Sequence, residues 1–179
     1  YDLFAPMGAS STKFTTQEAR DFLVAQFEGF CAEEAQMIAD AFDNEWIDFF
    51  PREGKAGGAF CAGVEAIGQS RILTNFDGAF GDVVTLAHEL GHAWHNECIK
   101  DHRVLNHDCS MPLAETASTF NECVVMASAI AKAADDNEKL ALIESQLQDA
   151  TQIICDIYSR FRFEKMVFEK REAEFMDAD

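Results

Sequence analysis

The sequence predicts a mainly α-helical fold with a small β element, an α+β architecture, in a chain of 179 residues. Apolar residues recur at helical spacing over long segments, and one short segment is rich in β-branched and apolar residues. Sixteen Phe and only three Pro favour compact packing over linkers. Hydrophobic residues make up 48% of the chain, which excludes a disordered polypeptide. The length suits one core, so we predict a single domain over 1–179.

The chain carries a formal net charge of −18. Nucleic acids and anionic membrane surfaces attract basic patches, so this charge argues against both as partners. An acidic surface could favour cationic substrates, although a solvated acidic face explains it more simply. The sequence has no run of eighteen apolar residues, so we expect no membrane span, and we expect no signal peptide.

Six cysteines are scattered through apolar stretches without a Cys-x-x-Cys pair. Disulfide frameworks usually show denser cysteine usage in shorter secreted chains, so we expect reduced, mostly buried thiols and a cytoplasmic protein. Cys98 and Cys109 flank the histidines described below and are weak candidates for metal ligands. The six residues are Cys31, Cys61, Cys98, Cys109, Cys123 and Cys155.

Two amphipathic helices are expected in the first fifty residues. The chain before Thr15 is predicted to be loop or extended, and Thr15 can cap a helix that has Glu18 in its first turn. The predicted apolar face of this helix comprises Phe22, Leu23, Phe27 and Phe30. A second helix is predicted from about Ala32 to a point before Pro51. Its predicted buried residues are Ala35, Ile38, Ala39, Phe42 and Trp46.

A glycine-rich stretch and a strand-like segment form the predicted β element. Residues 54–63 lack the Gly-Lys-Ser/Thr ending of a phosphate loop, so we predict a loop that leads into a short strand. Residues 70–76 are rich in β-branched and apolar side chains and predict a second strand. Residues 75–78 then predict a turn.

The remainder of the chain is predicted to form three helices. The first is expected over 82–100, with Asp82 as its cap. The second is expected over 110–134, because Pro112 is tolerated in a first turn. The third is expected over 136–171 and would be roughly 50 Å long at about 1.5 Å per residue. An apolar seam at 3- and 4-residue steps marks it as a packing helix. This seam comprises Leu140, Ile143, Leu147, Ala150, Ile154, Ile157 and Phe161.

All five histidines fall between residues 88 and 107, and two of them form a His-Glu-x-x-His motif on a predicted helix. Residues four apart share one helical face, so His88 and His92 can ligate one metal ion. Glu89 projects about 100° further around the helix axis. It can reach a metal-bound water without ligating the metal, and we predict that it is a general base.

A catalytic zinc ion needs a third protein ligand and an open fourth position. His95 lies about 10 Å along the helix axis from His88, too far for His88, His92 and His95 to share one ion. A longer pattern with a third histidine also fails, since His95 and Cys98 occupy its glycine and last histidine positions. Glu115 is the better candidate, because two helices joined by about ten residues can pack side by side.

Residues near the candidate ligands are expected to support the metal site without binding the ion. Ser118 and Glu122 share a helical face with Glu115 and can orient the metal ligands by hydrogen bonding. His95, His102 and His107 are more simply explained as hydrogen-bonding or surface residues. Two histidines and one carboxylate with an open position suit zinc best among divalent ions.

The motifs resemble the oligoendopeptidase F branch of the thimet-oligopeptidase-like zinc peptidases. Two specific segments, 85–92 and 114–122, carry the similarity together with weaker matches that extend it over nearly the whole chain. The weaker matches are 1–6, 46–48, 54–55 and 58–60. The resemblance implies a zincin-like helical core with a short sheet or hairpin before the motif helix. It also implies one zinc ion on His88, His92 and Glu115, with Glu89 as the base.

The resemblance implies a zinc-dependent endopeptidase that hydrolyses short oligopeptides. The strand near 58–60 could pair with the extended backbone of a peptide, and an equally simple interpretation is a strand that only supports the motif helix. Members of the family are much longer, and their later segment of Tyr and His residues that stabilise the transition state has no counterpart here. The two tyrosines are Tyr1 and Tyr158. We therefore expect a central catalytic fragment. Two alternatives stay open: a zinc-binding fragment without activity of its own, and a structural helical module with incidental histidines. The oligomeric state and cleavage preference stay open as well.

Overall fold

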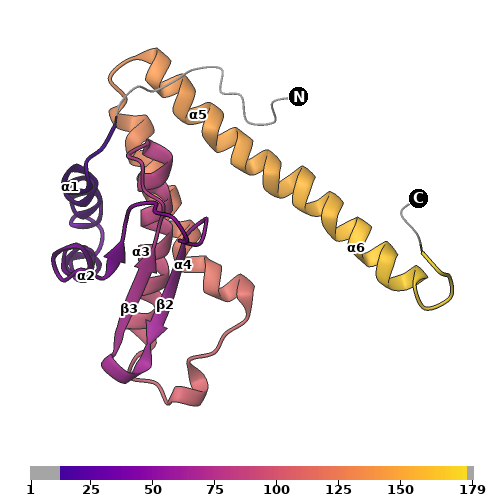
Figure 1. The fold of residues 1–179 in the computed structure, drawn as a ribbon. Coiled ribbons are helices and arrows are strands. Elements are labelled where there is room, and N and C mark those ends of the chain that lie inside the picture. Colours follow the sequence, from indigo (N-terminus) through magenta and orange to yellow (C-terminus); the bar gives the residue numbers. More distant parts are fainter. Residues whose placement is uncertain (1–12, 177–179) are drawn as a thin grey trace. The chain divides into compact units, whose positions relative to one another are not determined.

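The structure of the chain, a computed structural model, describes residues 13–176 (Figure 1). These residues fall into two compact units, 13–132 and 133–176. Helices dominate both units, and a three-stranded sheet lies in the first, so the predicted mainly α fold with a small β element is confirmed. The predicted loop and the weak family match within residues 1–12 lie outside the described residues.

Helix α1 (Thr16–Phe27) begins where the sequence predicts. The Thr15 hydroxyl accepts a hydrogen bond from the Glu18 backbone N–H at 3.1 Å, and the Glu18 carboxylate accepts one from the Thr15 N–H at 2.8 Å. This reciprocal cap satisfies two backbone donors that a helix end leaves free. Leu23, on the inner face, is fully buried.

Helix α2 (Ala32–Asp43) follows after a short turn and packs against α1. Phe30 and Trp46, which were predicted on the apolar faces of these two helices, do not belong to them, because each lies beyond the end of its helix. Phe30 is 59% exposed, and its ring centroid lies 5.3 Å from that of Phe120. Trp46 is half-buried and follows Glu45, whose φ of +58° turns the chain out of the helix. The buried residues that were predicted correctly on α2 are Ala35, Ile38 and Ala39.

The sheet has the strand order β1-β3-β2. Strand β1 (Ile47–Asp48) pairs parallel to β3 (Gln69–Leu73), and β2 (Phe60–Val64) pairs antiparallel to β3. The two predicted strands are therefore present, although β3 ends three residues before the predicted end at 76. Strand β1, which is two residues long, was not predicted from the sequence. Within residues 13–132 the second edge of β2 has no strand partner.

Helices α3 (Phe80–Ile99) and α4 (Met111–Lys132) lie side by side behind the sheet (Figure 1). Asp82 is not the cap residue that was predicted, since it stands in the first turn of α3. Its carboxylate instead reaches back and accepts hydrogen bonds from the backbone N–H groups of Asp77 at 2.9 Å and Ala79 at 3.0 Å. The core of this unit is formed by buried side chains of α1, α2, β3, α3 and α4. Its largest fully buried apolar members are Phe27, Leu23, Ile38, Ile72, Leu86, Leu90, Val83 and Val125.

The second unit is one helical run, in which α5 (Asp136–Thr151) and α6 (Tyr158–Lys170) are joined by a π-helical turn (Gln152–Ile157). Asp135 caps α5 by accepting two backbone N–H bonds at 2.9 Å. Several residues of the predicted apolar seam are exposed: Leu140, Leu147, Ile154, Ile157 and Phe161. Across the described residues, no helix has the length and apolarity that a membrane span requires.

Candidate metal centre

Three side chains predicted as metal ligands converge in the structure. His88 and His92 project from α3, and their Nε2 atoms are 3.2 Å apart. Glu115 projects from the start of α4, and its Oε2 lies 3.2 Å from the Nε2 of His88 and 3.4 Å from that of His92. Among the described residues, these three are the group of His, Cys, Asp and Glu side chains close enough to share one ion.

Helix geometry and a close helix contact explain this convergence. Spacing of four residues places His88 and His92 on one face of α3. Gly91, between them, faces α4, and a Cβ atom there would lie only 2.7 Å from the Ser118 Cα and 2.8 Å from the Ala117 carbonyl oxygen. The missing side chain therefore lets α4 approach α3 closely, which brings Glu115 opposite the histidines.

Hydrogen bonds orient each of the three side chains. The Nδ1 of His88 makes a short hydrogen bond with the Glu122 carboxylate, and the His92 imidazole donates to the backbone carbonyl of Ala114. The Ser118 hydroxyl, which is fully buried, donates to the Glu115 Oε2 at 2.9 Å. The positions predicted for Ser118 and Glu122, beside the ligands, agree with these contacts.

The two histidines differ in their electrostatic surroundings. The hydrogen bond that His88 donates to the Glu122 carboxylate raises the pKa of His88, and the nearby carboxylates of Glu89 and Glu115 act in the same direction. Burial lowers the pKa of His92. When the Nδ1–H of His88 donates to Glu122, the Nε2 of the neutral ring is free to accept and faces Glu115 and His92.

The distances fit a tetrahedral zinc site. Zinc ligands at about 2.0–2.2 Å in tetrahedral geometry are separated from one another by about 3.3–3.6 Å. The three separations observed here are 3.2, 3.2 and 3.4 Å. The donor set of two imidazoles and one carboxylate also suits zinc. The residues present therefore fit this ion.

Glu89 stands beside this cluster and is 6% exposed. Burial raises the pKa of its carboxyl group, and the neighbouring Glu115 and Glu122 raise it further. Glu89 lines a cleft of about 450 Å³ that also contains the three candidate ligands. The walls of the cleft come from β2, α3, the loop between α3 and α4, and the start of α4. They comprise Ala59, Phe60, Cys61, Gly63, His88, Glu89, His92, His95, Asn96, Ile99, His107, Cys109, Ala114 and Glu115.

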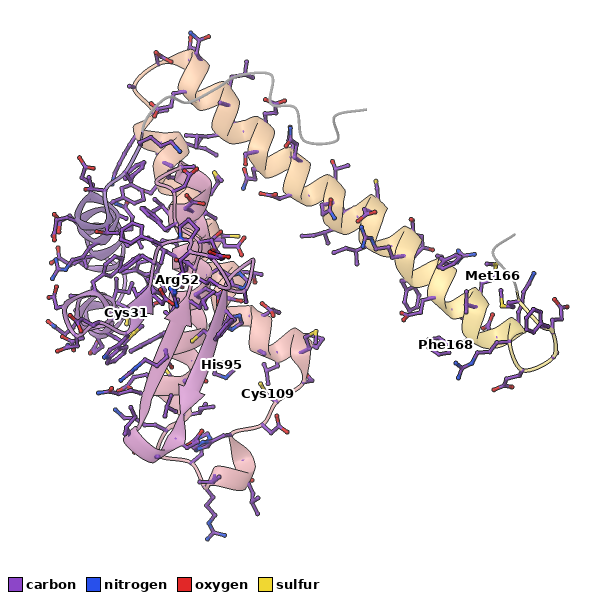
Figure 2. All side chains as sticks on the ribbon, in the orientation of Figure 1. Cys31, Arg52, His95, Cys109, Met166 and Phe168 are labelled. Carbon is purple, nitrogen blue, oxygen red and sulfur yellow. The ribbon has the colours of Figure 1, made fainter. Side chains whose placement is uncertain are left out.

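The remaining histidines and the cysteine candidates lie outside the three-residue cluster. His95 and Cys109, both labelled in Figure 2, line the cleft. His107 Nδ1 bonds to Glu65 at 2.9 Å and its Nε2 to the His102 carbonyl at 3.1 Å, so it ties the loop after α3 to the turn after β2. Burial raises the pKa of the nearby Cys61 thiol to about 11, which keeps it protonated.

Two features that support the site were not predicted from the sequence. The first is the role of Gly91. A signal for it was available, because a glycine inside a helix costs about 0.5–1 kcal/mol relative to Ala and is often explained by a close packing contact. The second is a buried link among three helices, in which Asn121 donates to Glu34 at 2.8 Å and to the Ala87 carbonyl at 3.3 Å. Glu34 on an otherwise apolar face of α2 was the available signal.

Comparisons with known proteins agree on one family. The sequence profile described as peptidase family M3 matches residues 33–176. The chain is 27% identical over 150 residues to oligopeptidase PepF of Bacillus subtilis (strain 168), a match that covers 83% of this chain and 22% of that protein. It is 30% identical over 148 residues to the chromosomal oligoendopeptidase F of Lactococcus lactis subsp. cremoris, covering 82% of this chain and 24% of that protein.

Solved structures share the fold. A crystal structure from Chlamydophila abortus, whose protein is described as a peptidase, superposes with a TM-score of 0.80 at 26% identity, covering 96% of this chain and 29% of that one. A structure described as an oligoendopeptidase F from Bacillus anthracis str. Ames gives a TM-score of 0.76 at 22% identity, covering 91% and 30%. The resemblance to oligoendopeptidase F is thereby confirmed. The chain spans about a quarter of the length of the curated relatives it matches.

Proposed function

The chain belongs to peptidase family M3, and on this premise we propose that it binds one zinc ion and hydrolyses peptide bonds of short oligopeptides. In this proposal His88, His92 and Glu115 hold the zinc ion, and Glu89 is the catalytic base. The observation that carries the proposal is the convergence of three metal-binding atoms within 3.4 Å of one another, beside a buried carboxylate. The oligopeptidase names of the relatives support the substrate class.

Bound zinc supplies a Lewis acid that polarises a peptide carbonyl and lowers the pKa of water. The residues of the chain supply the remaining steps. Glu89 accepts a proton from the attacking water and passes it to the leaving amine. Its raised pKa helps it to hold that proton between the two transfers. The low exposure of Glu89 limits exchange of the proton with bulk water.

The free edge of β2 is the proposed binding surface for the peptide backbone. Phe60, Cys61 and Gly63 of this strand line the cleft that contains the candidate ligands. An extended peptide can add to a free strand edge through main-chain hydrogen bonds. The peptide would then lie along β2 with its backbone close to Glu89.

A second candidate function is zinc binding without catalysis by this chain alone. The chain spans about a quarter of its curated relatives, and the side chains that line the described cleft include no tyrosine. Groups that stabilise the transition state would then come from other parts of a longer peptidase. We accordingly propose that 1–179 is the central catalytic part of such a protein.

The cysteines and the net charge bear on the cellular setting of the chain. The cytoplasm is the compartment expected from the cysteines, all six of which are unpaired thiols in the structure. The predicted burial of these thiols is wrong, because three of them are exposed and three are half-buried. The charge of −18 still argues against nucleic acid and anionic membranes as partners.

A Glu89→Gln variant tests the proposed function. With zinc present, we expect the parent chain to cleave members of a panel of fluorogenic short peptides. The variant should keep zinc and lose at least about 100-fold in kcat/KM, since a general base contributes roughly 10²–10⁴-fold. Glu97→Gln is the matched control, because Glu97 lies on the same helix outside the lining of the cleft.

Two results would contradict parts of this proposal. Full activity in the Glu89→Gln variant would exclude Glu89 as the base. A chain that binds zinc and cleaves no peptide of the panel would exclude the endopeptidase activity for this chain, and would favour the zinc-binding alternative.

A further inference from the structure

Glu122 lies on α4 two helical turns beyond Glu115, directly behind one of the candidate ligands. Its Oε1 makes a short hydrogen bond with the Nδ1 of His88. The Nε2 of the same imidazole faces Glu115 at 3.2 Å and His92 at 3.2 Å. One ring of His88 is therefore held between a carboxylate behind it and the proposed metal position in front of it.

We propose that Glu122 is a positioning residue for the metal site, which keeps the His88 proton on Nδ1 and the lone pair of Nε2 directed at the ion. This inference rests on the proposed zinc site. It adds a residue that touches neither the ion nor the peptide in that proposal. Glu122 acts through His88 alone.

The need for such a residue follows from the chemistry of imidazole. A neutral histidine carries its proton on either nitrogen, and only the tautomer with a free Nε2 can ligate a metal through that atom. A carboxylate that accepts from Nδ1–H fixes both the tautomer and the ring rotation, and increases the basicity of the ligating nitrogen. A charged acceptor does so more strongly than a neutral one.

The other two candidate ligands provide an internal comparison. The partner of His92 is the neutral backbone carbonyl of Ala114, which no side-chain substitution removes. The partner of Glu115 is the hydroxyl of Ser118 at 2.9 Å. Loss of the Glu122 carboxylate should thus disturb His88 while His92 and Glu115 keep their own hydrogen bonds.

If Glu122 only tied α3 to α4, its substitution would have different effects from those expected of a positioning residue. The Glu122 side chain is 36% exposed, and these helices also pack through buried side chains such as Val125 and Leu90. A structural tie would affect the unfolding of the metal-free protein. A positioning role would affect zinc affinity and the tautomer of one histidine.

The test compares zinc binding by the parent chain, Glu122→Gln and Glu122→Ala, measured by competition with a chromogenic chelator. We expect zinc affinity to fall by about 10–100-fold in the Ala variant, the range typical for such partners. The Gln variant should be intermediate, because its amide oxygen still accepts from Nδ1 without the charge. Glu97→Ala is the control, since its side chain is 32% exposed and is paired with Lys100 rather than with a histidine.

A second measurement uses the metal-free proteins. Nitrogen-15 NMR of the imidazoles at alkaline pH should show His88 as the Nδ1–H tautomer in the parent chain and a mixture of tautomers in Glu122→Ala. Unchanged zinc affinity and an unchanged His88 tautomer in both variants would overturn the inference. If the parent chain binds no zinc, the proposed function fails instead, and the NMR comparison still decides the role of Glu122.

Discussion

Glu34 brings a carboxyl group into the interior beneath the candidate site, where 2% of the residue is exposed. Its hydrogen-bond donor is the amide of Asn121, which also binds the Ala87 carbonyl next to His88. This link ties α2, α3 and α4 together one residue away from a candidate ligand. Burial raises the pKa of Glu34 above its ordinary value of 4.5, and the Asn121 bond only partly opposes that shift.

A Glu34→Gln variant should reveal this raised pKa, because its folding stability should depend on pH differently from that of the parent chain. A carboxyl with a raised folded-state pKa stabilises the fold below pH 4.5, and this stability is lost as the pH rises through the folded-state pKa. The variant does not titrate, so its stability relative to the parent should increase between those two values. Each pKa unit corresponds to about 1.4 kcal/mol.

Thermal unfolding of both proteins from pH 4 to pH 8 provides the measurement. The amide oxygen of the variant can still accept from Asn121, so the comparison isolates the ionisation. Parallel melting profiles over the whole range would show that Glu34 does not titrate differently in the folded protein.

At the scale of residues, spacing was enough to predict His88, His92 and Glu89 as candidates, and the expected packing of two helices added Glu115. The four-residue step of His88 and His92 depends only on helix geometry, which is local. The partners of these residues were harder to predict. The link between Glu34 and Asn121 joins positions 87 residues apart, and no local pattern reports such a contact.

The contact between α3 and α4 decides whether Glu115 reaches the two histidines. At Gly91 the atoms that a methyl group would meet are backbone atoms of Ser118 and Ala117, at 2.7 and 2.8 Å. Backbone atoms cannot swing aside as the end of a flexible side chain can. A larger residue at this position must therefore move one helix away from the other.

Gly91→Ala should consequently weaken both folding and zinc binding. The gain in helix propensity is about 1 kcal/mol, whereas overpacking typically costs about 1–3 kcal/mol. We expect a net loss of stability in denaturant unfolding and a zinc affinity lowered about 10-fold or more, as for loss of a partner that orients a ligand.

Gly81→Ala is the matched control for this prediction. Gly81 lies in the first turn of the same helix, and a Cβ atom there would meet nothing within 4 Å. This variant should be neutral or slightly stabilising. Equal effects of the two substitutions would show that the approach of α4 does not depend on Gly91.

Most helices could be predicted from caps and periodicity, because those signals are local. Thr15 with Glu18, and Asp135 before α5, specify their helix starts through side-chain bonds within a few residues. Strand β1 escaped prediction because its two residues become a strand only by pairing with Ile72 and Leu73, 25 positions later. The exposed position of Phe30 was not predicted either, because the apolar periodicity of the sequence continues past the residue at which α1 ends.

On the scale of the whole molecule, the candidate site belongs entirely to the first unit. Its ligands come from α3 and α4, and its cleft is closed by β2 and the loop between those helices. Three carboxylates, those of Glu89, Glu115 and Glu122, surround two imidazoles in a chain whose net charge is −18. Such an arrangement favours a bound cation at the point where the acceptors converge.

Family membership was predictable from the sequence because the two specific segments lie on adjacent helices that build one site. The second unit was predictable as a helix from its 3- and 4-residue seam. The π-helical turn at Gln152–Ile157 was not predictable, since it arises from a local change in backbone hydrogen bonding rather than from the apolar pattern.

The zinc content of the purified chain tests the central claim most directly. After incubation with zinc and removal of the excess, elemental analysis should give one zinc ion per parent chain and almost none in His92→Ala. His95→Ala is the matched control, because His95 lines the same cleft but lies outside the three-residue cluster, and it should retain the ion. A parent chain without stoichiometric zinc, or a His92→Ala variant that binds as much zinc as the parent, would contradict the account.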